Sequence, residues 1–177
     1  MSAQSIERPR KAGAPASGYL AWIGIAALGL SPMTLGAATK SATFQVLATM
    51  VSDCTVISAP NIDFGTIGVL SANVDMTSTL TVACTPGTAY TVSLDAGTGT
   101  GSTITDRRMV SGSNSLKYQL FRDSGRTQNW GNTPGTDTQG GTGNGSNNAY
   151  TIYARIPAQT SPAVGSYAST VTATITY

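Results

Sequence analysis

The chain contains two cysteines, Cys54 and Cys84, and no histidine. An even number of cysteines in an oxidising compartment predicts a single disulfide between them. In the chain-entropy description, closing a loop of about thirty residues stabilises a fold by roughly 3 to 4 kcal/mol. The alternative is a pair of free thiols for metal or redox chemistry, but the sequence has no CxxC spacing and no histidine to complete such a site.

No set of residues fits a catalytic site. The chain has no evident carboxylate pair, and its glycine-rich stretches have neither the phosphate-binding spacing nor a following helix. A serine activated by Lys117 is formally possible, but no particular serine is indicated. We therefore predict that the protein is not an enzyme and holds no cofactor or metal.

Charged and aromatic residues suggest two other kinds of binding site. The segments Asp106-Arg107-Arg108 and Arg122-Asp123 could bind ligand charges, but we interpret them as solvated pairs at strand ends, each worth under about 1 kcal/mol. A sugar-stacking platform would use aromatic residues that we assign mostly to the core: Tyr118, Phe121, Trp130, Tyr150, Tyr153 and Tyr167. Trp130, beside a polar loop, has the best chance of exposure, yet we favour a packing role for it.

The first 38 residues have the pattern of a cleaved signal peptide. Basic residues precede an apolar run over residues 19–30, which is too short to span a membrane, and small residues lead to a cleavage site after Ala38. Removal of this leader takes three of the ten Lys and Arg residues and one of the eight Asp and Glu residues, so seven of each remain. A neutral mature chain gives no reason to expect nucleic acid or anionic membrane as a partner.

The rest of the chain predicts one all-β domain. Short alternating runs recur between clusters of Gly, Asn, Ser and Thr, which is typical of a β-sandwich. The clearest runs are residues 79–84, 89–95, 116–122, 149–156 and 169–177. The turn Thr85 to Thr88 predicts a hairpin of the first two runs, with Leu80, Val82, Cys84, Tyr90, Val92 and Leu94 in the core. Residues 96–115 and 124–148 are expected to be surface loops.

A further strand-like run lies between the leader and Cys54. In residues 42–51, Phe44, Val46, Ala48 and Met50 share one face, while Thr43, Gln45, Leu47, Thr49 and Val51 share the other. The pattern fits a strand lent to another molecule, and it also fits an ordinary first strand that completes its own sandwich.

The last run has the same alternation. Val171, Ala173, Ile175 and Tyr177 alternate with threonines, which predicts a half-buried strand. Because the sequence stops at Tyr177, we expect the sheet to end incomplete.

Five segments together resemble the spore coat protein U family, which includes subunits of Csu-type pili assembled by the archaic chaperone-usher route. The segments are Cys54-Thr55-Val56 leading to Asp63-Phe64-Gly65; residues 80–84; residues 116–123 with Arg126-Thr127 and Trp130-Gly131; residues 153–157; and Gly165-Ser166-Tyr167 running into the C-terminus. No segment is specific alone, and their order and spacing carry the resemblance. Ala154 departs from the glycine expected in many relatives.

The resemblance implies an immunoglobulin-like β-sandwich that lacks its final strand and is completed by a donor strand from another subunit. Residues 39–52 would be the donor extension, inserting Phe44, Val46, Ala48 and Met50, and residues 53–177 the pilin domain, whose groove includes Val171, Ala173, Ile175 and Tyr177. The implied partners are a periplasmic chaperone, an outer-membrane usher and other pilus subunits. The implied function is a structural and adhesive pilus subunit at the cell surface, supporting attachment and biofilm formation. The alternative is a secreted coat or matrix-binding module that does not polymerise.

Overall fold

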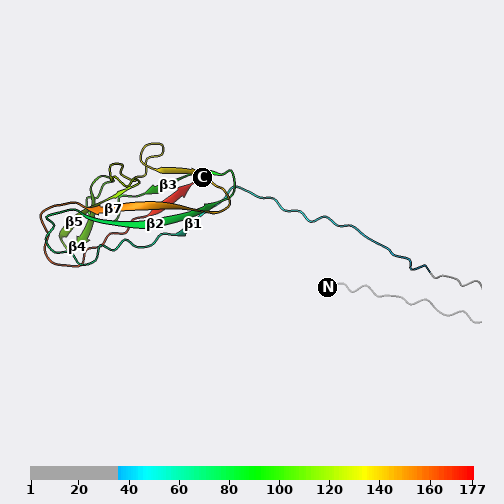
Figure 1. Cartoon of the computed structure of the whole chain (residues 1–177), viewed down its shortest axis with the longest axis horizontal. Coiled ribbons are helices and arrows are strands. Elements are labelled where there is room, and N and C mark those ends of the chain that lie inside the picture. Colours follow the sequence, from blue (N-terminus) through cyan, green and yellow to red (C-terminus); the bar gives the residue numbers. More distant parts are fainter. Residues whose placement is uncertain (1–35) are drawn as a thin grey trace, which may run out of the picture. The chain divides into compact units, whose positions relative to one another are not determined.

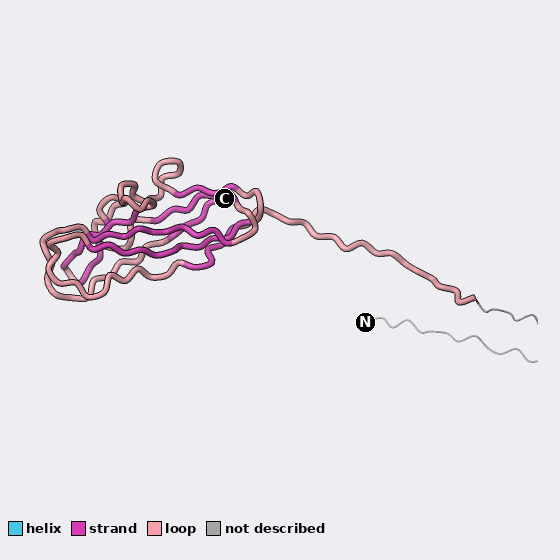
Figure 2. Tube along the Cα trace, viewed as in Figure 1, coloured by secondary structure: helices cyan, strands magenta, loops and turns pink. Residues whose placement is uncertain are grey.

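The structure is a computed structural model that describes residues 36–177. The predicted leader, residues 1–38, lies outside the described residues except for its last three. The described chain is all-β, and two antiparallel sheets form a sandwich (Figures 1 and 2). One sheet has the order β1-β2-β7-β5-β4 and the other β6-β3-β8. The strands are β1 (Cys54–Ser58), β2 (Val74–Cys84), β3 (Ala89–Leu94), β4 (Arg107–Ser111), β5 (Asn114–Phe121), β6 (Gln139–Thr142), β7 (Asn147–Ile156) and β8 (Ala173–Thr176).

The core forms where the alternating runs of the two sheets face each other. The predicted core positions of β2 and β3 are buried, and Leu80, Val82 and Val92 are fully so. Burying such side chains stabilises the fold by about 1.5 to 3 kcal/mol each. The predicted disulfide between Cys54 and Cys84 is present and joins directly opposed residues of β1 and β2.

The predicted hairpin of β2 and β3 is wrong, although its turn is correct. The Thr88 amide donates to the Thr85 carbonyl oxygen at 3.1 Å, and Gly87 has φ +83°, a conformation that glycine adopts at no steric cost. However, β2 pairs with β1 and β7, whereas β3 pairs with β6 and β8. Because both edges of β2 are occupied by these strands, the turn carries the chain into the opposite sheet.

Two predicted loops contain strands. Residues 96–115 include β4, which pairs with β5 in a hairpin, and residues 124–148 include β6 and the start of β7. The sequence of β6, QGGT, has no apolar alternation, and its pairing with β3 depends on backbone hydrogen bonds. Gly141 is required there because a Cβ atom would lie 2.4 Å from the Tyr150 hydroxyl and 2.7 Å from the Tyr90 ring. These contacts are long-range, so the local pattern did not reveal the strand.

Arg107 is not the solvated residue that we predicted. It is fully buried, and its guanidinium donates to four backbone carbonyl oxygens: those of Asp95 at 2.9 Å, Ile104 at 3.1 Å, Leu94 at 3.2 Å and Trp130 at 2.6 Å. Burial lowers the pKa of Arg107 from its ordinary value. Trp130 is fully buried as predicted, and its indole nitrogen donates to the Val92 carbonyl oxygen at 2.9 Å. Arg107 thus connects β4 with β3 and with the segment that follows β5.

Replacing Arg107 with Met is expected to destabilise the protein by at least about 3 kcal/mol, because it leaves buried carbonyl oxygens without donors. Urea unfolding at neutral pH measures the change. Arg108→Met is the matched control, because Arg108 makes a partly exposed ion pair with Asp106 at 2.7 Å and should cost under about 1 kcal/mol. Equal losses for the two variants would contradict the structural role of Arg107.

Candidate strand-binding groove

Two strands on one side of the sandwich each have a free edge. Within residues 36–177, β8 pairs only with β3, and β1 pairs only with β2. A free edge presents backbone amide and carbonyl groups that can pair with another strand. In an antiparallel ladder, successive residues direct these groups to opposite sides. Since the Thr172 carbonyl oxygen accepts a hydrogen bond from the Asp95 amide, next to β3, the alternation also turns Thr174 and Thr176 toward β3, and the backbone groups of Ala173 and Ile175 face the free edge.

Residues 168–172 continue the line of β8 and are fixed by hydrogen bonds on the same side. The Thr172 amide donates to Oδ1 of Asp95 at 3.0 Å, and the Asp95 amide donates to the Thr172 carbonyl oxygen at 3.1 Å. Two similar bonds join Thr98 and Thr170, at 3.1 and 3.0 Å. The Tyr118 hydroxyl donates to the Ser169 hydroxyl at 3.0 Å. These bonds position residues 168–172 and leave the other edge of this segment uncovered.

The surroundings of Asp95 favour its ionised form. Burial raises the pKa of Asp95, but the hydrogen bonds from Thr172 and Gly97 and the positive charge of Arg107 lower it more, so the net pKa lies below the ordinary value. In its ionised form, the Asp95 carboxylate therefore accepts the hydrogen bond that holds Thr172 in place.

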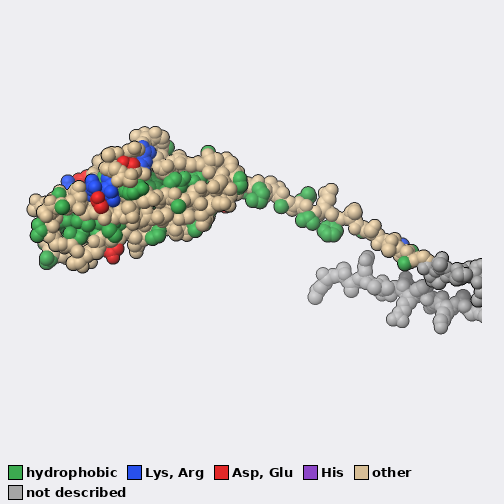
Figure 3. Space-filling model, viewed as in Figure 1, with side chains coloured by type: hydrophobic (Ala, Val, Ile, Leu, Met, Phe, Trp, Pro, Cys, Tyr) green, Lys and Arg blue, Asp and Glu red, His purple; other side chains and the backbone are tan. Residues whose placement is uncertain are grey.

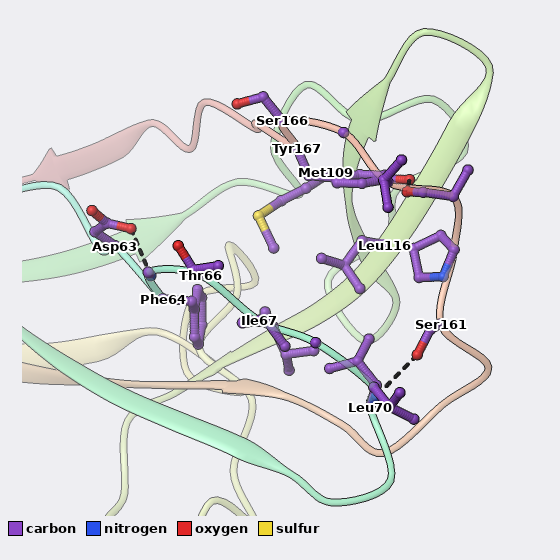
Figure 4. A pocket seen from close by; sticks show the side chains of 18 of the residues that line it. Asp63, Phe64, Thr66, Ile67, Leu70, Met109, Leu116, Ser161, Ser166 and Tyr167 are labelled. Carbon is purple, nitrogen blue, oxygen red and sulfur yellow. Dashed lines mark hydrogen bonds between the residues drawn. The ribbon is translucent and has the colours of Figure 1, made fainter.

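A cavity of about 870 Å³ opens between the two walls (Figure 4). Residues 62–70, after β1, form one wall, and residues 161–167, before β8, form the other. Apolar side chains point into it, and the labelled ones in Figure 4 are Phe64, Ile67, Leu70, Met109, Leu116 and Tyr167. Residues 62–70 and 161–167 belong to no assigned strand, and the floor between them is apolar. We call this cavity, together with the free edges of β1 and β8 that continue from its two walls, the edge groove.

We call the end of the edge groove at residues 161–167 its wide end. Hydrogen bonds join the two walls there. The Leu70 amide donates to the Ser161 hydroxyl at 2.9 Å, and the Gln159 amide donates to the Leu70 carbonyl oxygen at 3.1 Å. The Tyr167 hydroxyl donates to the Ala163 carbonyl oxygen at 2.6 Å. The wide end is therefore a fixed structure.

The residues that we predicted for the groove lie along one wall. Val171, Ala173 and Ile175 are half-buried and pack against the core, whereas Tyr177 is 58 % exposed. Their role in binding a donor strand remains a prediction. We missed the opposite wall: Ile62, Phe64 and Ile67 also pack against the core, and the period-two spacing of the first two was a usable signal. Met109 and Leu116, on β4 and β5, had no local signal.

The predicted donor segment, residues 42–51, forms no strand and is exposed. Phe44 is 88 %, Val46 86 % and Met50 83 % exposed. Apolar side chains are visible along the extended segment that precedes the domain (Figure 3). The alternative of an ordinary first strand requires pairing and burial, and the structure has neither for this segment. The donor role itself remains a prediction.

In the described part of the chain, no group of three or more His, Cys, Asp or Glu side chains could hold a metal ion. Among residues 36–177, no helix is long and apolar enough to cross a membrane.

The sequence pattern that defines the Spore Coat Protein U domain matches residues 40–174. The chain belongs to this family. The predicted family is thereby confirmed, and the match includes most of the predicted donor extension. No curated protein is significantly similar to the chain.

One solved structure with a similar fold is the CsuC-CsuE chaperone-tip adhesion subunit pre-assembly complex from the archaic chaperone-usher Csu pili of Acinetobacter baumannii. The sequence identity is 21%, the TM-score is 0.56, and the match covers 73% of this chain and 41% of that chain. This chain thus shares its fold with a protein of that complex, and it spans under half of the matched protein.

We expect Asp95→Asn to lower the free energy of unfolding by roughly 1 kcal/mol at pH 7, because a charged acceptor is replaced by a neutral one. The folded-state pKa of Asp95 is depressed, so its contribution is present above about pH 4, the ordinary unfolded value, and is lost as the pH falls through the folded value. The difference between the two proteins should therefore shrink as the pH falls below about 4.

Urea unfolding across this pH range tests the expectation. Thr98→Val is the control, since it removes an uncharged hydrogen bond to Thr170 and should displace the stability curve by the same amount at every pH. An Asp95→Asn curve that stays parallel to that of the parent would refute the role of the carboxylate.

Proposed function

We propose that this protein is a structural subunit of a chaperone-usher pilus that polymerises by donor-strand complementation. One observation carries the proposal: the same chain has an edge groove with unpaired backbone on both walls and an exposed extension whose apolar side chains alternate at period two. Within residues 36–177, no strand occupies the groove, and the extension is not paired with a sheet. Addition of a strand from a second copy to the free edge of β8 satisfies both.

Burial of the apolar face of the extension stabilises its association with the groove of a second copy. Burying Phe44, Val46 and Met50 contributes about 1.5 to 3 kcal/mol each, or roughly 5 to 9 kcal/mol before backbone hydrogen bonds. Residues 42–51 extend over about 33 Å at about 3.3 Å per residue, close to the length of the wall formed by residues 167–177. Ala48 leaves a gap in this row of side chains.

The position of the extension indicates its direction in the groove. The extension joins the domain at Asp53, whose carboxylate accepts a hydrogen bond from the Tyr177 hydroxyl at 3.1 Å, so it leaves beside the end of β8. The wide end of the groove, at residues 161–167, lies before the start of β8.

A donor antiparallel to β8 places its C-terminal end, near Met50, at the wide end, and the next domain follows beyond it. A parallel donor would put the next domain where the subunit's own extension leaves. The antiparallel direction therefore gives a head-to-tail fibre.

Export and assembly follow from this function. Residues 1–38 are a signal peptide cleaved after Ala38, residues 39–52 the donor extension and residues 53–177 the pilin domain. A periplasmic chaperone covers the apolar groove until assembly, because an uncovered edge of this kind promotes aggregation. An outer-membrane usher then exchanges the chaperone for the extension of the next subunit. The fibre acts at the cell surface in attachment and biofilm formation. The CsuC-CsuE complex, in which a chaperone holds a pilus subunit before assembly, supports this sequence of partners.

Phe44→Asp should abolish polymerisation, because a carboxylate cannot enter an apolar groove without a partner. The full chain is exported by the cell that makes it, and unheated surface extracts are analysed for SDS-resistant ladders. Thr43→Asp is the matched control, since the neighbouring residue lies on the opposite face of the extension and should leave the ladder intact. A parent chain that remains a monomer under these conditions would support the non-polymerising coat or matrix module instead.

A further inference from the structure

The extension has a second apolar feature that donor-strand insertion does not use. Leu47 and Val51 lie on the face opposite to Phe44, Val46 and Met50, and they are 84 % and 69 % exposed. When the inner face fills the groove, this outer face points away from the floor. Both residues lie in the C-terminal half of the segment, next to the domain that carries it.

The wide end of the edge groove has a matching feature. Val69 and Val164 are almost completely exposed, at 84 % and 102 %, and they belong to the two opposite walls of the same cavity. The adjoining residues Leu70 and Ser161 are hydrogen-bonded, which fixes the spacing of the two walls. The neighbouring Gly165 packs tightly, since a Cβ atom there would lie 2.7 Å from the Ser111 hydroxyl. We call Val69 and Val164 the groove lips.

We propose that the groove lips bind the outer face of the inserted extension of a second copy of this chain, through Leu47 and Val51. The inference rests on the proposed function and its antiparallel donor direction. That direction places the C-terminal half of the extension at the wide end, between the lips. Only Ser52 and Asp53 separate Val51 from the next domain at Cys54, a span of about 10 Å, so Val51 must stay near the exit of the groove.

The groove lips therefore contact the outer face of the donor strand, while the apolar floor of the groove contacts its inner face. Four apolar side chains that are exposed in the separate chain become buried together, two from each copy. The contact lies outside the row of side chains that fills the groove, so it slows dissociation of the donor without altering how the strand is inserted. It also makes the donor segment complementary to the groove of another copy of the same chain.

A double-mutant cycle in the full, exported chain tests the contact. One variant carries Leu47→Ser and Val51→Ser, another Val69→Ser and Val164→Ser, and a third all four changes. The measurement is the rate at which SDS-resistant oligomers dissociate at a fixed elevated temperature. Each pair should accelerate dissociation roughly tenfold, which corresponds to about 1.4 kcal/mol, and the fourfold variant should be no faster than either pair. Gln45→Ser, on the same outer face but away from the lips, should match the parent.

The outcomes separate this inference from the function on which it rests. A parent chain that forms no oligomers overturns the proposed function. Oligomers whose dissociation is unchanged by the lip substitutions, or changed additively in the fourfold variant, overturn the lip contact alone.

Cross-linking gives an independent readout. Val51→Cys combined with Val164→Cys should yield subunits joined by a disulfide, whereas Gln45→Cys with Val164→Cys should not. Equal cross-linking of the two pairs contradicts the proposed position of the outer face.

Discussion

The guanidinium of Arg107 is the interaction on which the arrangement of the groove depends. It binds the carbonyl oxygens of Leu94 and Asp95, where β3 ends, and that of Trp130, which follows β5. The Asp95 carboxylate then accepts a hydrogen bond from the Thr172 amide, and Thr172 precedes β8. A single buried cation thus links the first sheet, the end of β3 and the wall of the groove. The fold satisfies this charge with backbone carbonyl oxygens, which keeps the wall fixed even though its outer edge has no partner.

An unfilled edge is costly for a small domain. The groove leaves half-buried apolar residues, such as Phe64 and Ile175, in contact with solvent, and it leaves backbone groups on both walls unpaired. The disulfide between Cys54 and Cys84 lies at the start of β1 and fixes one wall against β2. Together with the hydrogen bonds of Asp95 and Leu70, it fixes the positions of the two walls. This preorganisation reduces the entropy that an incoming strand must lose.

In the proposed function, the extension of one molecule completes the groove of another. The extension carries apolar residues on its inner face and two more near its C-terminal end on the outer face. The groove carries an apolar floor and, at its wide end, two exposed valines. Membership of the Spore Coat Protein U domain family and a fold shared with a protein of a pilus pre-assembly complex support the proposal that this complementarity serves fibre assembly.

The family was predicted from the order and spacing of five segments that resemble it. Short-range patterns in the sequence were sufficient for the all-β class, most strands, the disulfide and the core of β2 and β3. These features depend on side-chain alternation and on residue types, which are local properties. The tertiary structure alone decided that β3 leaves β2 for the opposite sheet, that QGGT pairs as β6, and that Arg107 is buried. It also brought Ile62, Phe64, Met109 and Leu116 to one cavity from distant segments. Each of these depends on which strand edges are already occupied and which carbonyl oxygens are within reach, and such long-range contacts leave no periodic signal in the sequence.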